Sequence, residues 1–344
     1  MKNIVKISFA FIVSCISIGL NAQDIHFTQF YASPLTQNPA NTGRFNGDWR
    51  VMNNYRIQWN FPGAGYYTYK TLTLGYDQPI HLKNATIGVG GIVVSDQTED
   101  IAGLNTMKIY VGGSYQMNID GHKISIGLQP GYVQVSNGTY DFGDSYIRST
   151  GHFDSESKSS GETIGTNKAK YLDINTGVTW SHKFGKITPV AGLALFHVNS
   201  PKETLFDKGD GRKALRKVFH AGGIYDINEQ WFLYPNISFM HERKAREITF
   251  GSSLGMKLPK NKYQLKSVFA GPMLRSNIIQ ADILDAAAII VGAKIQNLDI
   301  GISYDFNVSS LSSVSNGRGA WEFSIIYTAP STLLQKITVP CERL

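Results

Sequence analysis

The sequence predicts an all-β fold, a transmembrane antiparallel β-barrel of about 14 strands with an N-terminal plug-like segment. Three observations support this prediction. From Trp49 onward, stretches of about 9 to 14 residues alternate apolar and polar side chains. Beyond residue 22, no stretch has the roughly 18 consecutive apolar residues that a transmembrane helix needs. Aromatic residues make up 12% of the chain and glycines number 34, a composition that favours strands.

The alternation is clearest near the C-terminus. Leu298, Ile300, Ile302, Tyr304 and Phe306 share one face, whereas Asp299, Gly301, Ser303 and Asp305 share the other. Trp321, Phe323, Ile325 and Tyr327 likewise oppose Glu322 and Ser324. Because successive side chains of a strand point to opposite faces, one face suits lipid and the other suits a polar interior.

Applied to the whole chain, the same pattern predicts about fourteen strands, within two. They cover residues 49–59, 66–78, 85–95, 105–118, 122–135, 170–183, 187–198, 216–227, 231–242, 247–257, 262–274, 286–296, 298–306 and 319–328. Tight turns at 118–121, 184–186, 227–229 and 296–297 follow even-numbered strands, and the longer loops mostly follow odd-numbered ones. The connections at 61–65 and 243–246 are short exceptions. This sorting predicts loops outside the cell and both chain ends in the periplasm.

The N-terminus has the pattern of an export signal. Lys2 and Lys6 precede an apolar run over residues 7–20, and Ala22 ends a small-residue cleavage site. The predicted division is a signal peptide at 1–22, a periplasmic or lumen-plugging segment at 23–47, an outer-membrane barrel at 48–328 and a periplasmic tail at 329–344. A rival interpretation takes residues 12–15 as a lipoprotein cleavage box. If Cys15 leaves with the signal, Cys341 has no internal disulfide partner.

Charge suggests one candidate surface and argues against nucleic acid as a partner. The formal net charge of +7 falls to +5 without Lys2 and Lys6, which is mild for a chain of this length. Basic residues crowd two predicted external loops: Lys208, Arg212, Lys213, Arg216 and Lys217 in one, and Arg243, Lys244 and Arg246 in the other. This basic rim is a candidate contact for acidic partners or lipopolysaccharide phosphates. The alternative is a solvated loop surface whose charge is screened by salt.

Catalytic chemistry has weak support. Residues 251–255 fit the Gly-x-Ser-x-Gly spacing but fall within a predicted strand, whereas a nucleophile elbow needs a strand-to-helix turn. His197 and His220, with Glu203 or Asp207, form either an acid–base cluster or ordinary polar residues at the rim. No metal-ligand spacing occurs. We therefore expect no enzyme activity, no cofactor and no metal.

The segment before the first strand is rich in aromatic residues and amides, which an idle tail would not need. It could fill the lumen as a plug, or it could dock a periplasmic partner. Its candidate plug or partner contacts are Phe27, Gln29, Phe30, Tyr31, Pro34, Asn38 and Pro39.

These residues begin a resemblance to the PorP/SprF family of type IX secretion and gliding proteins of Bacteroidetes. The resemblance covers essentially the whole mature chain. Its blocks are residues 26–35, 38–40 with Gly43, 55–59, 192–199 with Pro201, 303–311, 316–319 and 339–341. The departures are small, at Trp321 and at residues 342–344.

The resemblance implies an outer-membrane barrel that associates with a secreted, surface-anchored protein, or with periplasmic ring proteins and lipoproteins of the secretion apparatus. In gliding members the secreted partner is a large adhesin, recognised through a C-terminal sorting domain. The leading hypothesis is therefore a barrel that binds and anchors, or helps export, such a protein. The alternative is a passive outer-membrane channel or porin. A hydrolase using a rim serine and histidine is a third, weakly supported hypothesis.

Overall fold

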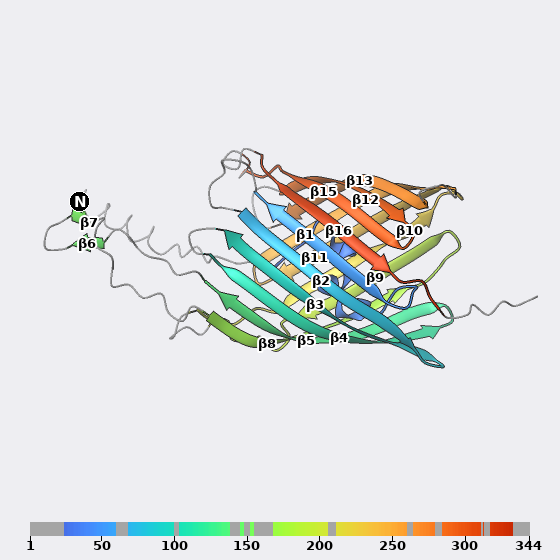
Figure 1. Cartoon of the computed structure of the whole chain (residues 1–344), viewed down its shortest axis with the longest axis horizontal. Coiled ribbons are helices and arrows are strands. Elements are labelled where there is room, and N and C mark those ends of the chain that lie inside the picture. Colours follow the sequence, from blue (N-terminus) through green and yellow to red (C-terminus); the bar gives the residue numbers. More distant parts are fainter. Residues whose placement is uncertain are drawn as a thin grey trace, which may run out of the picture.

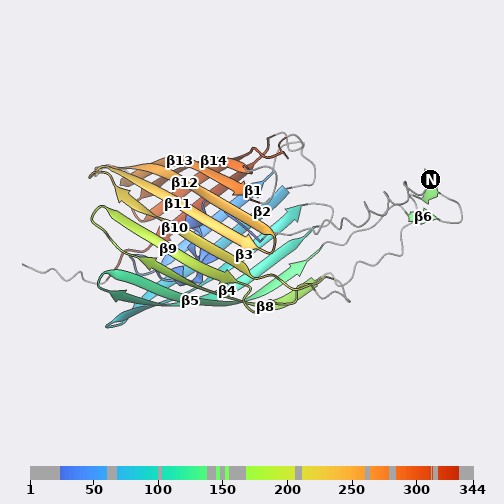
Figure 2. The ribbon, with the colours of Figure 1, turned by 180° about the vertical axis from the view of Figure 1, so that it is seen from behind.

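A computed structural model describes residues 24–59, 68–99, 103–137, 145–147, 152–154, 168–205, 211–259, 264–278, 284–310, 312 and 317–332. Fourteen antiparallel strands close into one barrel (Figures 1 and 2). The predicted barrel and its strand number are confirmed, whereas the role of the N-terminal segment as a plug stays a prediction. The predicted signal peptide and nearly all of the predicted C-terminal tail lie outside the described residues.

The barrel strands follow one another around the wall in chain order. They are β1 (Arg50–Gln58), β2 (Thr68–His81), β3 (Ala85–Glu99), β4 (Asn105–Ile119), β5 (His122–Ser136), β8 (Lys168–Ser181), β9 (Ile187–Phe196), β10 (Arg216–Asp226), β11 (Trp231–Glu242), β12 (Ala245–Lys257), β13 (Leu265–Asn277), β14 (Ala286–Ile295), β15 (Leu298–Asn307) and β16 (Ala320–Thr328). Between β5 and β8, the short strands β6 (Ser145–Ile147) and β7 (His152–Asp154) pair only with each other.

Closure joins the first strand to the last. β1 pairs with β16 from Arg50 opposite Thr328 to Gln58 opposite Ala320, so no strand edge is left along this seam. The β2–β3 hairpin is longer than predicted: β3 continues beyond residue 95 to Glu99 opposite Thr68, and β2 continues beyond residue 78 to His81 opposite Thr86. The added residues of β3 are polar on both faces. Backbone hydrogen bonds therefore extend β3 where the apolar alternation has already ended.

Side chains sort by face as the alternation predicts. In β16, Trp321 and Phe323 are exposed on the outside, whereas Glu322 between them is fully buried. In β2, Leu72, Leu74 and Tyr76 are exposed in the same way. A barrel that is apolar outside and polar inside is suited to lipid, because lipid cannot satisfy polar groups.

The two ends of the barrel differ in their connections. We call one the turn end, where residues 82–84, 120–121, 182–186, 227–230, 258–264 and 296–297 connect strands. We call the other the loop end, which carries the longer connections, among them 137–167 and 197–215. The β11–β12 connection, residues 243–244, is the short exception at the loop end. Among the described residues, no helix is both long and apolar enough for a membrane span.

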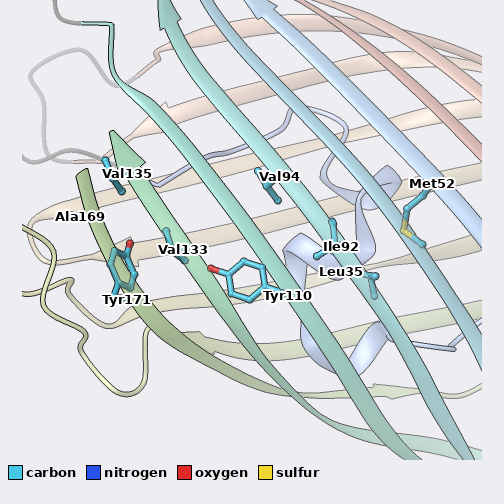
Figure 3. Packing of buried hydrophobic residues seen from close by; sticks show 9 residues of the cluster. All are labelled: Leu35, Met52, Ile92, Val94, Tyr110, Val133, Val135, Ala169 and Tyr171. Carbon is cyan, nitrogen blue, oxygen red and sulfur yellow. The ribbon is translucent and has the colours of Figure 1, made fainter. Parts of the chain in front are cut away.

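Residues 24–47, called here the N-terminal segment, lie inside the barrel before β1 begins (Figure 1). They form three single-turn elements: η1 (Phe30–Ala32), α2 (Pro34–Gln37) and η2 (Pro39–Asn41). Leu35 of α2 is 1% exposed and packs among inward-facing side chains that include Met52, Ile92 and Val94 (Figure 3). The segment is therefore part of the folded core.

Candidate functional site

The candidate site is the contact surface between the N-terminal segment and the inner barrel wall. Of the candidate contacts predicted from sequence, Phe27, Gln29, Phe30, Pro34, Asn38 and Pro39 are buried, and Tyr31 is half-buried. Short turns leave many backbone groups without helix or sheet partners, and such groups are costly to bury unpaired. The wall supplies the missing partners, as the following contacts show.

The first group of contacts surrounds Thr28 and Gln29. Their backbone N–H groups donate to the two carboxylate oxygens of Glu322, at 2.9 and 2.8 Å. The Thr28 hydroxyl donates to Asp305 at 2.8 Å. Arg56 of β1 neutralises both acids, with its guanidinium 2.8 Å from Asp305 and 3.2 Å from Glu322. A buried carboxylate needs such a cation and hydrogen-bond donors together.

Gln29 is held by its side chain as well as its backbone. Its amide nitrogen donates to the Ser303 hydroxyl and to the Glu322 carbonyl, each at 3.1 Å. Its amide oxygen accepts from the Ser324 hydroxyl at 2.8 Å. With all these groups paired, Gln29 is 0% exposed.

The second group of contacts surrounds Asn38. Its side-chain oxygen accepts from the Ala40 backbone N–H at 2.9 Å and so caps η2. Its side-chain nitrogen donates to the carbonyls of Val178 and Leu193, each at 3.1 Å, and lies 3.1 Å from His220 Nε2. One amide thereby joins the segment to β8, β9 and β10.

Two inward-facing glycines make room for this turn. A Cβ at Gly127 of β5 would overlap the backbone of Pro39 and Ala40, and a Cβ at Gly177 of β8 would overlap the Asn38 amide. The neighbouring Ser125 hydroxyl donates to the Ala40 carbonyl at 2.8 Å. The wall is therefore shaped to this part of the segment.

The third group of contacts lies nearer the turn end. The Gly43 backbone N–H donates to Asp77 of β2 at 2.7 Å. Arg50 holds the same carboxylate through Nε at 2.9 Å and Nη2 at 2.7 Å, a bidentate pair. Asp77 is 0% exposed, so its charge is balanced entirely within the protein.

The fourth group, at the loop end, surrounds Asp24. Its carboxylate pairs with Lys108, lies 3.2 Å from His197 Nε2 and lies 3.4 Å from the Arg216 guanidinium. Burial would raise the pKa of Asp24, but Lys108 and Arg216, with the His197 hydrogen bond, hold that pKa well below its usual range. Asp24 is therefore ionised across the physiological range.

The segment thus runs lengthwise through the barrel. Asp24 lies among the loop-end residues, whereas Asp48 follows the segment and its N–H bonds to the carbonyl of Ala329, beside the end of β16 at the turn end. The described start of the chain and the end of β16 are at opposite ends of the barrel.

The basic residues of the predicted rim separate into two sets. Arg212, Lys217, Arg243, Lys244 and Arg246 are exposed. Lys213 is half-buried and faces Glu242 at 3.9 Å. Arg216 points inward, 6% exposed, so it does not belong to an external surface; its guanidinium lies over the Phe196 ring, 4.1 Å from the centroid. Lys208 lies outside the described residues.

The residues considered for catalysis have structural roles. His197 and His220 do not lie on an exposed rim; they are 1% and 5% exposed. His197 Nδ1 lies 2.9 Å from Asp173, and its other ring nitrogen faces Asp24. Residues 251–255 lie within β12, as predicted. Within the described ranges, no group of three or more His, Cys, Asp or Glu side chains is placed to hold a metal.

Sequence reasoning named the segment side of this site but missed its wall. The wall residues that it did not name as part of the site are all on strands and all inward-facing: Arg50, Arg56, Asp77, Lys108, Asp173, Asp305 and Glu322. The available signal was a set of charged residues in the middle of predicted strands. Because strand partners far apart in sequence decide which charges meet, alternation alone could not pair them.

Residues 19–327 match the family described as type IX secretion system membrane protein PorP/SprF. The chain belongs to the PorP/SprF family. The predicted family is therefore confirmed. No curated protein matches the chain.

Solved structures similar to this PorP/SprF protein are outer-membrane barrels. The CymD monoaromatic hydrocarbon channel is 10% identical with a TM-score of 0.51, and the match covers 87% of this chain and 93% of that one. A Pseudomonas aeruginosa FadL homologue is 12% identical with a TM-score of 0.49, covering 86% and 94%. The Ralstonia pickettii toluene transporter TbuX is 11% identical with a TM-score of 0.45, covering 86% and 92%. At these identities the CymD match supports the fold alone.

The motif blocks of the PorP/SprF resemblance meet in space. Thr28 of the first block contacts Arg56 of the strand β1 block and Asp305 of a late block. His197, from the middle block, contacts Asp24 beside the first. Segments almost 300 residues apart thus build one site, and that site is where the N-terminal segment binds the inner barrel wall.

Proposed function

We propose that this outer-membrane PorP/SprF protein is a binding and anchoring barrel that captures a secreted surface protein through its C-terminal sorting domain, without covalent chemistry of its own. The observation that carries the proposal is the N-terminal segment inside the barrel. A fourteen-stranded wall is wide enough to enclose a channel unless something occupies it. Here the N-terminal segment occupies it, held by buried contacts.

Those contacts surround the segment. The strands that bond it include β1 and β2, β4 and β5, β8 to β10, and β15 and β16. Several of its partners are charged and nearly inaccessible, and breaking a buried ion pair costs about 3–5 kcal/mol. A segment held this firmly supports the binding and anchoring function over the passive channel, because a channel needs an open path for solute.

The surface suited to capture is the loop end. Arg212, Arg243 and Arg246 are exposed there, and the Arg243 guanidinium donates to the Arg212 carbonyl, which brings the β9–β10 and β11–β12 connections together. The nearby acids Glu203 and Glu242 already face Tyr171 and Lys213. The exposed cations are therefore available to an acidic partner domain. Ring proteins or lipoproteins of the secretion apparatus would approach from the turn end.

A second candidate is a passive outer-membrane channel. The likeness to the CymD channel favours it, since that barrel is similar along most of its length. For this chain to conduct, the N-terminal segment would have to leave the lumen or leave a continuous path beside it. The two candidates therefore differ in what the segment does.

Two measurements on the tagged protein from outer membranes test the proposal. In mild detergent, mass spectrometry should find a co-purifying secreted protein with a C-terminal sorting domain. In planar bilayers, the intact protein should be non-conducting, and a variant lacking residues 24–43 should conduct. Co-purification of ring components alone would instead indicate a role within the machinery. Steady conductance by the intact protein, without a bound partner, would favour the channel.

A further inference from the structure

The barrel wall has an interruption between β10 and β11. These strands pair from Arg216 opposite Glu242 to Gly222 opposite Asn236, and again from Tyr225 opposite Leu233. The two intervening positions of β10, Gly223 and Ile224, have no partners across the seam, where Pro235 lies. Proline has no N–H to donate to a ladder. The strands stay close here: a Cβ at Gly222 would meet the Pro235 carbonyl, and Gly223 and Ile224 still pair with β9.

A cavity lies on the inner side of this seam. Its volume is about 270 Å³, and it separates the N-terminal segment from the inner faces of β9 to β11. Phe30, Tyr31 and Pro34 line it from the segment, and Tyr234 lines it from the wall. The Tyr31 and Tyr234 rings meet edge to face at 5.3 Å. This part of the cavity is apolar and aromatic.

A groove lies on the outer side of the same seam. Its volume is about 600 Å³, and its lining is almost entirely apolar, including Ile187, Ile224, Tyr225, Ile237 and Phe250. The cavity and the groove share the lining residues Ala221, Gly222, Gly223, Ile224 and Asn236. A single layer of residues, at the stretch where β10 does not pair with β11, therefore separates the cavity from the outer groove.

The cavity also holds a cation without a counter-charge. The Arg44 side chain lines it, and within the described chain no carboxylate forms an ion pair with Arg44. Burial and the neighbouring Arg50 lower the pKa of Arg44 to about 10, so it is charged at neutral pH. The Tyr31 side chain lines the same cavity, and its hydroxyl is buried without a hydrogen-bond partner. A half-buried cation and an unpaired hydroxyl favour an anion that accepts hydrogen bonds.

We propose that this seam is a lateral binding site for a single-chain carboxylate amphiphile drawn from the membrane. The carboxylate would pair with Arg44 and accept from the Tyr31 hydroxyl. The chain would lie against the Phe30 and Tyr234 rings and reach the outer groove past Gly222 and Gly223, where β10 and β11 would part over the two residues that do not pair. The charge selects an anionic head group, and the narrow glycine wall selects one unbranched tail.

The test uses dodecanoate carrying a photoreactive diazirine at its tail end. The probe is irradiated with the purified full-length protein in dodecyl maltoside micelles, and labelled peptides are mapped by mass spectrometry. Competition by unlabelled dodecanoate, dodecanol and acetate reports the contributions of head and tail. The variants are Arg44→Gln, Tyr31→Phe and, as a matched control, Lys183→Gln, which removes an exposed cation at the turn end.

We expect labelling concentrated on residues 221–225, 235–237 and 250, where the tail end would lie. Dodecanoate should compete at least about tenfold better than dodecanol, and acetate should not compete, because head and tail both bind. Arg44→Gln should weaken binding about tenfold and Tyr31→Phe about threefold, with Lys183→Gln unchanged. Labelling spread over all lipid-facing strands, equal competition by dodecanol, or unchanged binding in both cavity variants would overturn the proposal.

Discussion

At the scale of single residues, the inner wall of the barrel is fitted to one particular occupant. Gly127 is the clearest case, because the missing side chain is replaced by the backbone of Pro39 and Ala40. An ordinary lumen facing water would tolerate a methyl group at this position. The absence of a side chain at Gly127 therefore fits the close approach of the segment.

We predict that Gly127→Ala loosens the segment, because its Cβ must displace a backbone that is held on several sides. The reporter is Ser33→Cys, a position 1% exposed, in a Cys341→Ser background. Maleimide labelling in detergent should become at least about tenfold faster than without the glycine change. Gly113→Ala is the matched control, since its Cβ would meet nothing nearer than 3.8 Å. Equal labelling of the two glycine variants would show that the close approach does not matter.

Arg56 provides a second prediction at this scale. Arg56→Gln leaves Glu322 buried without its cation, and the expected cost is about 3 kcal/mol of segment docking or barrel stability. Faster labelling of Ser33→Cys, or a lower midpoint in urea unfolding, would report it. Lys294→Gln is the control, because its pair with Asp299 is exposed and worth at most about 1 kcal/mol. If both substitutions have the same small effect, the buried network does not hold the segment.

At the scale of elements, the strands could be predicted well and the segment only in part. Strands such as 298–306 and 319–328 were recognisable because lipid imposes a strict apolar alternation. The polar end of β3, residues 96–99, was not, because backbone pairing continues there without that signal. The aromatic residues of the segment could be recognised from the sequence, but its binding surface on the wall could not. The positions of η1, α2 and η2 depend on contacts with strands that are distant in sequence.

The same reasoning explains the error at Arg216. It is adjacent in sequence to exposed cations, and a charge count grouped it with them. In the structure it is the first residue of β10 and faces inward, where it meets Asp24 and Phe196. The start of this strand was predicted correctly at residue 216. The charge count took no account of which face of the strand Arg216 occupies, and that face decides the direction of its side chain.

The docking of the segment should resist mild acid. Because the folded pKa of Asp24 is depressed, the stabilisation from this carboxylate is present above its unfolded pKa of about 3.9 and is lost only as pH falls through the lower folded value. Hydrogen exchange of peptides within 24–47, corrected for intrinsic rate, should therefore be equally slow at pH 7 and pH 5. Asp24→Asn should exchange faster at both values. Protection that disappears by pH 5 in the unmodified protein would contradict this assignment.

At the scale of the whole molecule, the two ends of the barrel present different surfaces. The loop end carries exposed arginines on two connections that touch each other, whereas the turn end carries short connections with scattered lysines. The N-terminal segment lies between these two ends. Under the proposed function, the loop end would capture the secreted partner and the turn end would face the periplasmic machinery.

Charge reversal at the loop end tests whether its arginines steer that capture. We predict that Arg212→Glu, Arg243→Glu and Arg246→Glu together slow association of the co-purifying secreted protein about tenfold at low salt, because electrostatic attraction acts mainly on the association rate. Stopped-flow or surface-based kinetics with the purified pair would measure the rate. The difference should shrink as ionic strength rises, since screening at about 0.15 M already limits charge effects to about 8 Å.

The matched control reverses three exposed lysines at the turn end, Lys83, Lys123 and Lys183, and so makes the same change in net charge. If capture occurs at the loop end, this control should alter the association rate far less than the arginine variant. Equal slowing by both variants would mean that only net charge matters. Slowing by the lysine variant alone would place the partner at the turn end and would require a different account of which face binds the secreted protein.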